Sequence, residues 1–128
     1  MLRPDLSDTE LPVDRPLSEI KAELFKALGH PGRIRILEVL SDQPHTVTEM
    51  VPLVGLEASH LSQQLAILRR SGVVTVRREG TTATYTLASG DIAELLVVAK
   101  RFLLDGLRVR QQLFADVNIT PLATPRRR

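Results

Sequence analysis

The chain has 128 residues, which is enough for one domain with a hydrophobic core and too few for two ordinary domains. Hydrophobic residues make up 43% and charged residues 25%, so wholesale disorder is excluded. There is no cysteine, which excludes disulfides, thiolate metal ligands and a cysteine nucleophile. The net charge of +2 is uneven: residues 1–23 hold three basic and six acidic side chains, or −3, and the remainder is +5. That balance permits a polyanionic partner without requiring one.

The amino terminus lacks the apolar core of an export signal, and no segment approaches the roughly 18 apolar residues that cross a membrane. We therefore expect a cytoplasmic protein without membrane contact. Three prolines among acidic residues predict an extended arm over 1–16. We expect one folded domain over 17–117 and a tail over 118–128.

The first helix is expected to begin at an N-cap, Ser18, and to end at Gly29. A second helix is predicted from Pro31 to about residue 41, because proline suits the first turn. Thr46 and Glu49 have the spacing of a capping box, which predicts a short third helix.

A glycine turn at residue 55 leads to a fourth helix, predicted over 58–70 from the spacing of its leucines. The β-branched segments 73–78 and 83–87 then predict a hairpin with a flexible tip. A long last helix follows, capped by Ser89 or Asp91. Its apolar arc is too broad for an exposed surface, and a second copy of the chain is the simplest cover.

Residues 46–70 match a helix-turn-helix, in which a short helix braces a second helix that enters the major groove of DNA. The predicted fold class is therefore mainly α with a β-hairpin, a dimeric winged helix-turn-helix of order α-α-α-α-β-β-α. Serine and glutamine can reach phosphates, glutamine can pair with adenine, and arginines at a hairpin tip suit a phosphate backbone. The side chains expected to contact double-stranded DNA are Ser59, His60, Ser62, Gln63, Gln64, Arg69, Arg77 and Arg78.

Three segments, ALGHPGRIRIL, LSQQLAILRRSGVV and REGTTATYTL, together resemble the ArsR/SmtB family of bacterial winged-helix repressors. The resemblance covers roughly residues 20–105. It implies a homodimer formed by the first and last helices, with two recognition helices in successive major grooves of an imperfect inverted repeat. The residues expected at that interface are Leu24, Phe25, Leu95, Leu96, Ala99, Phe102 and Leu103.

The chain departs from the family pattern at two kinds of position. Glu57 stands where members usually have serine or threonine, at the mouth of the recognition helix, and would repel a phosphate there. Metal sensors of the family use cysteines, or an acid with histidines on the last helix, and residues 91–116 contain no histidine. Carboxylates alone make a poor site for metals that prefer nitrogen or sulfur ligands, so we expect no metal site and no cofactor.

The three histidines have different expected roles. His30 precedes a helix-starting proline and is interpreted as a local hydrogen-bonding residue, whereas His45 is expected in a solvated loop. His60 is the one for which a phosphate contact is expected, from its position on the recognition helix.

Other readings remain open at this point. A winged helix can serve as a protein-interaction module with only weak DNA affinity, and the basic hairpin tip would then be a solvated surface. The apolar residues of the last helix could line a pocket for a small-molecule effector, which the sequence does not identify. An enzyme is disfavoured, because paired carboxylates, a nucleophile with its base and a phosphate-cradling glycine loop are missing at usable spacings.

Overall fold

The structure is a computed structural model that describes residues 14–116. Within that range the chain forms five helices and three short strands. In chain order these are α1 (Leu17–Leu28), α2 (Pro31–Asp42), β1 (His45–Thr46), α3 (Val47–Val54), α4 (Ala58–Arg70), β2 (Val74–Glu79), β3 (Thr82–Leu87) and α5 (Gly90–Asp116). The expected winged helix-turn-helix order is confirmed.

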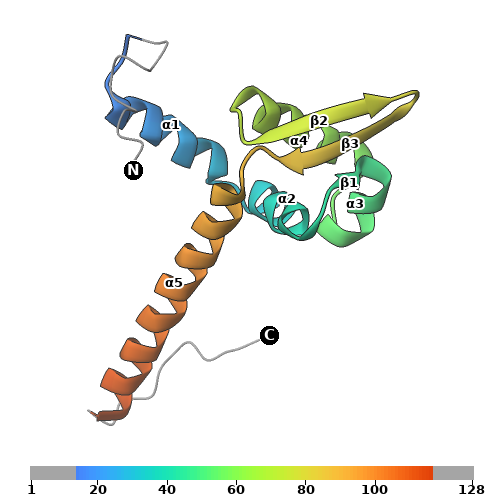
Figure 1. Cartoon of the computed structure of the whole chain (residues 1–128). Helices are drawn as coiled ribbons and strands as arrows, with labels where there is room; N and C mark the ends of the chain where they lie inside the picture. The colour runs from blue at the N-terminus through green and yellow to red at the C-terminus, as the bar shows by residue number, and fades with distance from the viewer. Residues whose placement is uncertain (1–13, 117–128) are drawn as a thin grey trace.

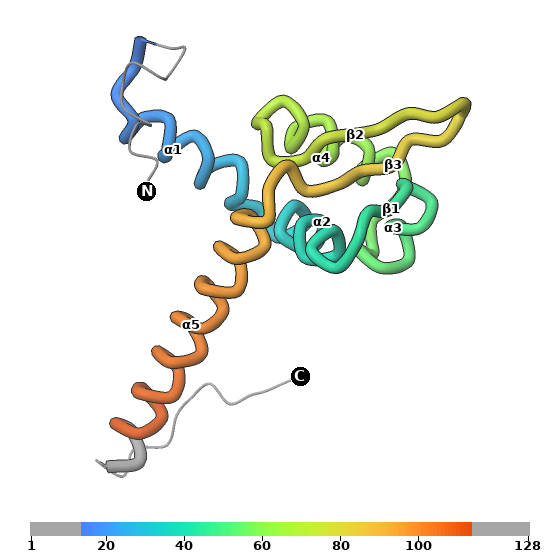
Figure 2. Tube along the Cα trace, in the orientation of Figure 1, coloured from blue at the N-terminus to red at the C-terminus, as the bar shows by residue number. Residues whose placement is uncertain are grey.

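Helices α2, α3 and α4 pack with the three strands into a body, from which α1 and α5 extend in diverging directions (Figure 1). The tube view shows the same separation of α5 from the body beyond the beginning of the helix (Figure 2). Only the beginning of α5 touches the body, where Ile92, Leu95 and Leu96 pack against the core. Most of this 27-residue helix therefore finds no partner within its own described chain.

The core is aliphatic and lies between α2, α3, α4 and the start of β2. Its fully buried side chains are Ile36, Leu37, Met50, Leu61, Leu65, Leu68 and Val73. On α4 the buried positions are 61, 64, 65 and 68, the spacing that places side chains on one face of a helix. The opposite face of α4 is left to solvent.

The strands form an antiparallel sheet in the order β1-β3-β2. In the hairpin Val74 pairs with Leu87 and Glu79 pairs with Thr82, so the tip is two residues long. Gly80 at that tip has φ 62°, a conformation that favours glycine and suits a tight hairpin turn.

Two local expectations are wrong. His45 lies in β1 rather than in a loop: it pairs with Tyr85, and its side chain, beside Glu49, is only 12% exposed. The first helix begins at Leu17 instead of after Ser18, because the carbonyl of Pro16 accepts the first helical hydrogen bond, from the Glu19 amide.

Other boundaries are confirmed. The fourth helix spans 58–70 as predicted, and α2 starts at Pro31. His30 acts as its N-cap, because its Nδ1 accepts a hydrogen bond from the Gly32 amide at 3.0 Å. The predicted arm lies outside the described residues except for 14–16, and the predicted tail lies wholly outside them.

Candidate nucleic-acid interface

The exposed face of α4 carries most of the side chains that the sequence assigned to DNA. Ser59, His60, Ser62 and Gln63 are all exposed, opposite the leucines that enter the core. Glu57 occupies the N-cap position and makes no capping hydrogen bond with its side chain. The first amides of α4 are therefore open to solvent, where a helix N-terminus can attract an anion, although the Glu57 carboxylate counters that attraction.

Gln64 does not belong to this face, which corrects one expectation. Its side chain is only 7% exposed and lies on the core side of α4 between leucines. Its Oε1 accepts a hydrogen bond from Nε of Arg33 at 2.8 Å. Because that contact holds the side chain inside the fold, Gln64 is left out of the candidate interface.

Two pairs of arginines flank the exposed face. Arg69 and Arg70 end α4, and Arg77 and Arg78 lie near the hairpin tip; all four are exposed. Successive residues of a strand point to opposite faces, so Arg77 and Arg78 project from the two sides of the hairpin. Nε of Arg77 lies 3.8 Å from a carboxylate oxygen of Glu79, but both groups are solvated and such a pair holds them weakly.

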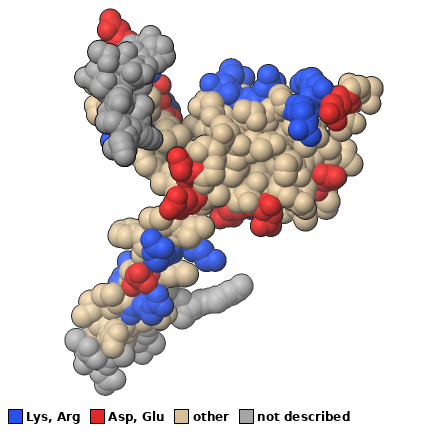
Figure 3. All heavy atoms as spheres, viewed as in Figure 1, with Lys and Arg blue, Asp and Glu red and all other residues tan. Residues whose placement is uncertain are grey.

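The charges are sorted between two edges of the body. In the space-filling view, basic atoms gather along the edge that carries α4 and the hairpin, whereas acidic atoms lie mostly along the opposite edge (Figure 3). The exposed acids of the body include Glu38 and Asp42 of α2 and Glu49 of α3. One edge of a nearly neutral body is thus suited to a polyanion.

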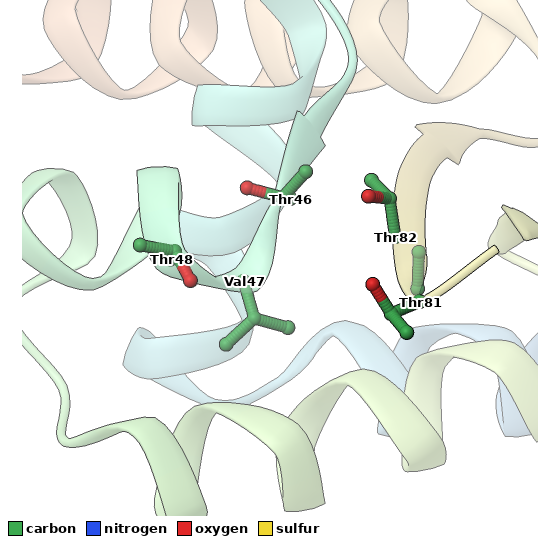
Figure 4. Close-up of a pocket in the computed structure, with 6 residues that line it drawn as sticks. Thr46, Val47, Thr48, Thr81 and Thr82 are labelled. Atoms are coloured by element: carbon green, nitrogen blue, oxygen red, sulfur yellow. The ribbon is translucent and has the colours of Figure 1, made fainter. Parts of the chain in front are cut away.

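A hollow beside the hairpin was not anticipated from the sequence. It has a volume of about 340 Å³ and is lined by Thr46, Val47, Thr48, Thr81, Thr82 and Ala83. Thr46, Val47 and Thr48 stand at the start of α3, and Thr81 and Thr82 face them from the hairpin turn (Figure 4). The only sequence signal is the abundance of threonine in TVT and TTAT, which are distant in the chain and meet through the pairing of β1 with β3.

The start of α3 is fixed by the predicted capping box. The Thr46 hydroxyl accepts from the Glu49 amide at 3.2 Å, and a Glu49 carboxylate oxygen accepts from the Thr46 amide at 3.0 Å. That bond to the Thr46 amide, helped by His45, holds the pKa of the Glu49 carboxyl below its ordinary value. Gly55, with φ 80°, then makes the left-handed turn into α4.

The residues expected at a dimer interface divide into two groups. Leu24, Leu95 and Leu96 are half-buried and pack against the core of their own chain. The others are exposed, namely Phe25, Ala99, Phe102 and Leu103, with Phe102 reaching 75% exposure. This apolar surface continues along α5 through Leu107, Val109 and Leu113.

The described residues contain neither a cluster of metal ligands nor a membrane-spanning helix. Between residues 14 and 116, no three His, Asp or Glu side chains are grouped closely enough to hold a metal ion. None of the described helices combines the length and the apolar character needed to traverse a bilayer.

A helix-turn-helix with an exposed polar second helix, a basic hairpin and a long last helix defines the class of winged helix-turn-helix DNA-binding proteins. Comparison with known proteins narrows this class. Residues 30–76 match the family model described as bacterial regulatory protein, arsR family. The chain belongs to the ArsR family, and it is a DNA-binding transcriptional regulator.

Three similar proteins support this assignment. The chain is 49% identical to the HTH-type transcriptional regulator Rv0081 of Mycobacterium tuberculosis over 85% of its own length and 96% of the relative. The crystal structure of that protein superposes with a TM-score of 0.69 at 52% identity, covering 76% of this chain and 98% of the other.

A homodimeric winged helix-turn-helix domain of Mb0332 from Mycobacterium bovis matches with a TM-score of 0.66 at 28% identity, over 82% and 94% of the two chains. The transcriptional repressor BigR from Xylella fastidiosa matches with a TM-score of 0.63 at 32% identity, over 66% and 87%.

Proposed function

We propose that this regulator acts in the cytoplasm as a homodimeric repressor that binds an inverted-repeat operator through α4 and the hairpin. The observation that carries the proposal is the coincidence of two features on one edge of the body. The exposed polar face of α4 and the arginines of the hairpin lie where the basic atoms gather (Figure 3). A major groove admits a helix, and a basic hairpin beside it can hold the adjoining backbone.

Each side chain has a role in this proposal. Gln63 reads a base edge, while Ser59, His60 and Ser62 grip phosphates or the groove wall. Arg69, Arg77 and Arg78 neutralise backbone phosphates on either side.

The threonine-lined hollow extends this set. Its hydroxyl groups at Thr48, Thr81 and Thr82 lie at the junction of α3 and the hairpin, and hydroxyls are common donors to phosphate oxygens. A backbone phosphate beside the hairpin would find donors there without any further charge.

Dimerisation is supported by the apolar surface of α5. Phe102, Leu103 and Leu107 are exposed in the single chain, and soluble proteins rarely leave so much contiguous apolar surface uncovered. A second copy would cover it and would set two recognition helices about 34 Å apart, one turn of the duplex. The winged helix-turn-helix domain of Mb0332, which has a similar fold, is itself homodimeric.

Repression follows from geometry: a dimer that spans about one duplex turn of a promoter blocks polymerase access. A pocket for a small-molecule effector, lined by the apolar residues of α5, is the alternative use of this surface, because a second copy would cover the same side chains.

The test is a titration of the purified protein against a fragment of its own upstream DNA and an unrelated fragment of equal length, at 50 and 200 mM salt. We expect tight, salt-sensitive binding that favours the upstream fragment, together with reduced transcription from it in a purified system. Absence of binding at low salt would contradict the proposal and favour a protein-interaction module. Increased transcription would contradict the repressor assignment while leaving the DNA interface intact.

A further inference from the structure

Arg33 joins three helices through one side chain. It lies in the first turn of α2, where its Nε donates to Oε1 of Gln64 at 2.8 Å. Its Nη1 donates to the carbonyl oxygen of Ala27, also at 2.8 Å. Gln64 belongs to the recognition helix α4 and Ala27 to the last turn of α1, so one guanidinium links the two.

The Gln64 end of this link is built into the core. Gln64 is the only buried polar side chain among the described residues, and it interrupts a stripe that is otherwise leucine. Burial of an amide is unfavourable unless it is hydrogen-bonded, and apolar residues would pack better at this position. Packing alone therefore does not explain why an amide is buried here, whereas its hydrogen bond to Arg33 does.

The Ala27 end completes the termination of α1. The last carbonyls of a helix lack partners within it. The amide of Gly29 bonds the carbonyl of Lys26 at 3.2 Å, and the amide of His30 bonds that of Leu28 at 2.8 Å. Arg33 donates to the carbonyl of Ala27, which lies between Lys26 and Leu28 in the sequence. The helix dipole also favours a cation at this end of α1.

The guanidinium suits this task because its donors point in fixed directions within one plane. Holding two acceptors at once fixes the angle between the helices that supply them. A lysine at this position has one mobile ammonium group and could not hold both acceptors in the same orientation.

We propose that Arg33 is a positioning residue that sets the angle of the recognition helix relative to α1, and thereby the half-site spacing that the dimer accepts. This inference rests on the proposed function, and it takes the dimer to be formed by the first and last helices, as the resemblance to the family implies. If α1 is anchored on the partner protomer, the angle between α1 and α4 determines how the two recognition helices are related. In this proposal Gln64 does not contact DNA; it accepts the hydrogen bond by which Arg33 orients α4.

The experiment uses the full-length protein and a defined DNA probe. An inverted repeat is first enriched from random-sequence duplexes by the wild-type protein, and its central spacer is then lengthened or shortened by one base pair. One base pair turns the half-sites by about a tenth of a turn. Affinity is measured for all three spacings and for a single half-site, with wild type, Arg33→Lys and Gln64→Leu.

We expect wild type to lose affinity by about tenfold or more on either change of spacing, and both variants to lose only about threefold or less. Affinity for the single half-site should stay within about twofold, because the face of α4 is untouched. Gln64→Glu keeps an acceptor for Arg33, so this variant, unlike Gln64→Leu, should keep the spacing preference of wild type.

Arg35→Lys is the matched control. Arg35 lies two residues away on α2 and donates through Nε to the carbonyl of Val54 at 3.1 Å, at the end of α3. It touches neither α1 nor α4 in this way, so its variant should keep the spacing preference even if stability falls.

The possible results distinguish failure of the inference about Arg33 from failure of the proposed function. If Gln64→Leu and Arg33→Lys each lower affinity relative to wild type by the same factor at all three spacings, the spacing preference is unchanged. The link is then only structural, and the inference is overturned. If Arg35→Lys relaxes spacing as much as Arg33→Lys, the effect belongs to α2 in general and the inference again fails. If the wild type enriches no inverted repeat, the proposed function itself fails, and the inference falls with it.

Discussion

Gln63 and Gln64 are neighbours in the sequence with opposite environments. Gln63 is exposed on the face of α4 that is offered to DNA, whereas Gln64 is buried and bonded to Arg33. Residues one apart on a helix differ by about 100° around its axis, which is enough to move a side chain from groove to core. Identical side chains therefore have separable functions here.

Replacing Gln63 with alanine tests whether it reads a base. A good contact between glutamine and adenine contributes about 1–3 kcal/mol of discrimination, so Gln63→Ala should flatten the preference at one base pair in each half-site. The measurement is competition binding against operators mutated one base pair at a time. His60→Ala is the matched control and should weaken all sequences alike. A uniform loss with Gln63→Ala would instead assign that residue to a phosphate.

The Glu49 carboxyl makes the stability of α3 depend on pH. Its pKa is lowered in the fold, chiefly by the hydrogen bond from the Thr46 amide, so the ionised form stabilises the folded state. This contribution is present above the ordinary glutamate pKa of about 4.3 and is lost as the pH falls through the lowered value. Urea unfolding at pH 6 and pH 3.5 should therefore show a smaller acid loss for Glu49→Gln than for wild type.

The same substitution at Glu38, an exposed acid of α2, provides the control. It removes the same charge without touching the capping box, so a smaller acid loss confined to Glu49→Gln assigns the pH dependence to the cap. Equal losses for Glu49→Gln and wild type would mean that the capping carboxylate contributes no pH dependence.

At the scale of elements, the strongest sequence signals were those with a local physical cause. The limits of α4 followed from leucine spacing, and the start of α3 from the Thr46–Glu49 capping box. Strand β1 was missed because two residues carry no alternation, and its pairing with β3 depends on a distant segment. The burial of Gln64 was missed for a related reason, since its partner Arg33 is 31 positions away.

The hairpin should contribute affinity without sequence preference. Replacing Arg77 and Arg78 with alanine removes two cations from each protomer and four from a dimer. Each phosphate contact contributes about 0.9 to the slope of log affinity against log salt, so the slope should shrink by up to about 3.6. Binding to operator and unrelated DNA should weaken by similar factors, measured by titration at four salt concentrations.

A charge-matched control separates contact from net charge. Lys100→Ala with Arg101→Ala removes the same charge from α5, away from the hairpin, and should leave the slope near that of wild type. If the two double variants lower the slope equally, the hairpin makes no specific contact and only the overall charge matters.

At the scale of the whole molecule, the body and the long helix α5 differ in how much of their apolar surface is buried within one chain. The body encloses its own core, and α5 extends away from it (Figure 1). Apolar side chains are exposed over most of the described length of α5. These side chains are not uniform around the helix. Leu104 is two residues from Phe102, hence about 200° away, and lies among the charged Lys100, Arg101 and Arg108.

This asymmetry predicts which face of α5 forms the dimer. Phe102→Glu places a charge within the broad apolar face and should convert the dimer to a folded monomer of 14.2 kDa, as measured by light scattering. Leu104→Glu introduces the same charge on the other side and should remain dimeric. The monomer should lose far more affinity for an inverted repeat than for a single half-site, because only the former engages both protomers. If Leu104→Glu dissociates the dimer and Phe102→Glu does not, the interface lies on the charged side of α5, and the arrangement of recognition helices must be rebuilt from that face.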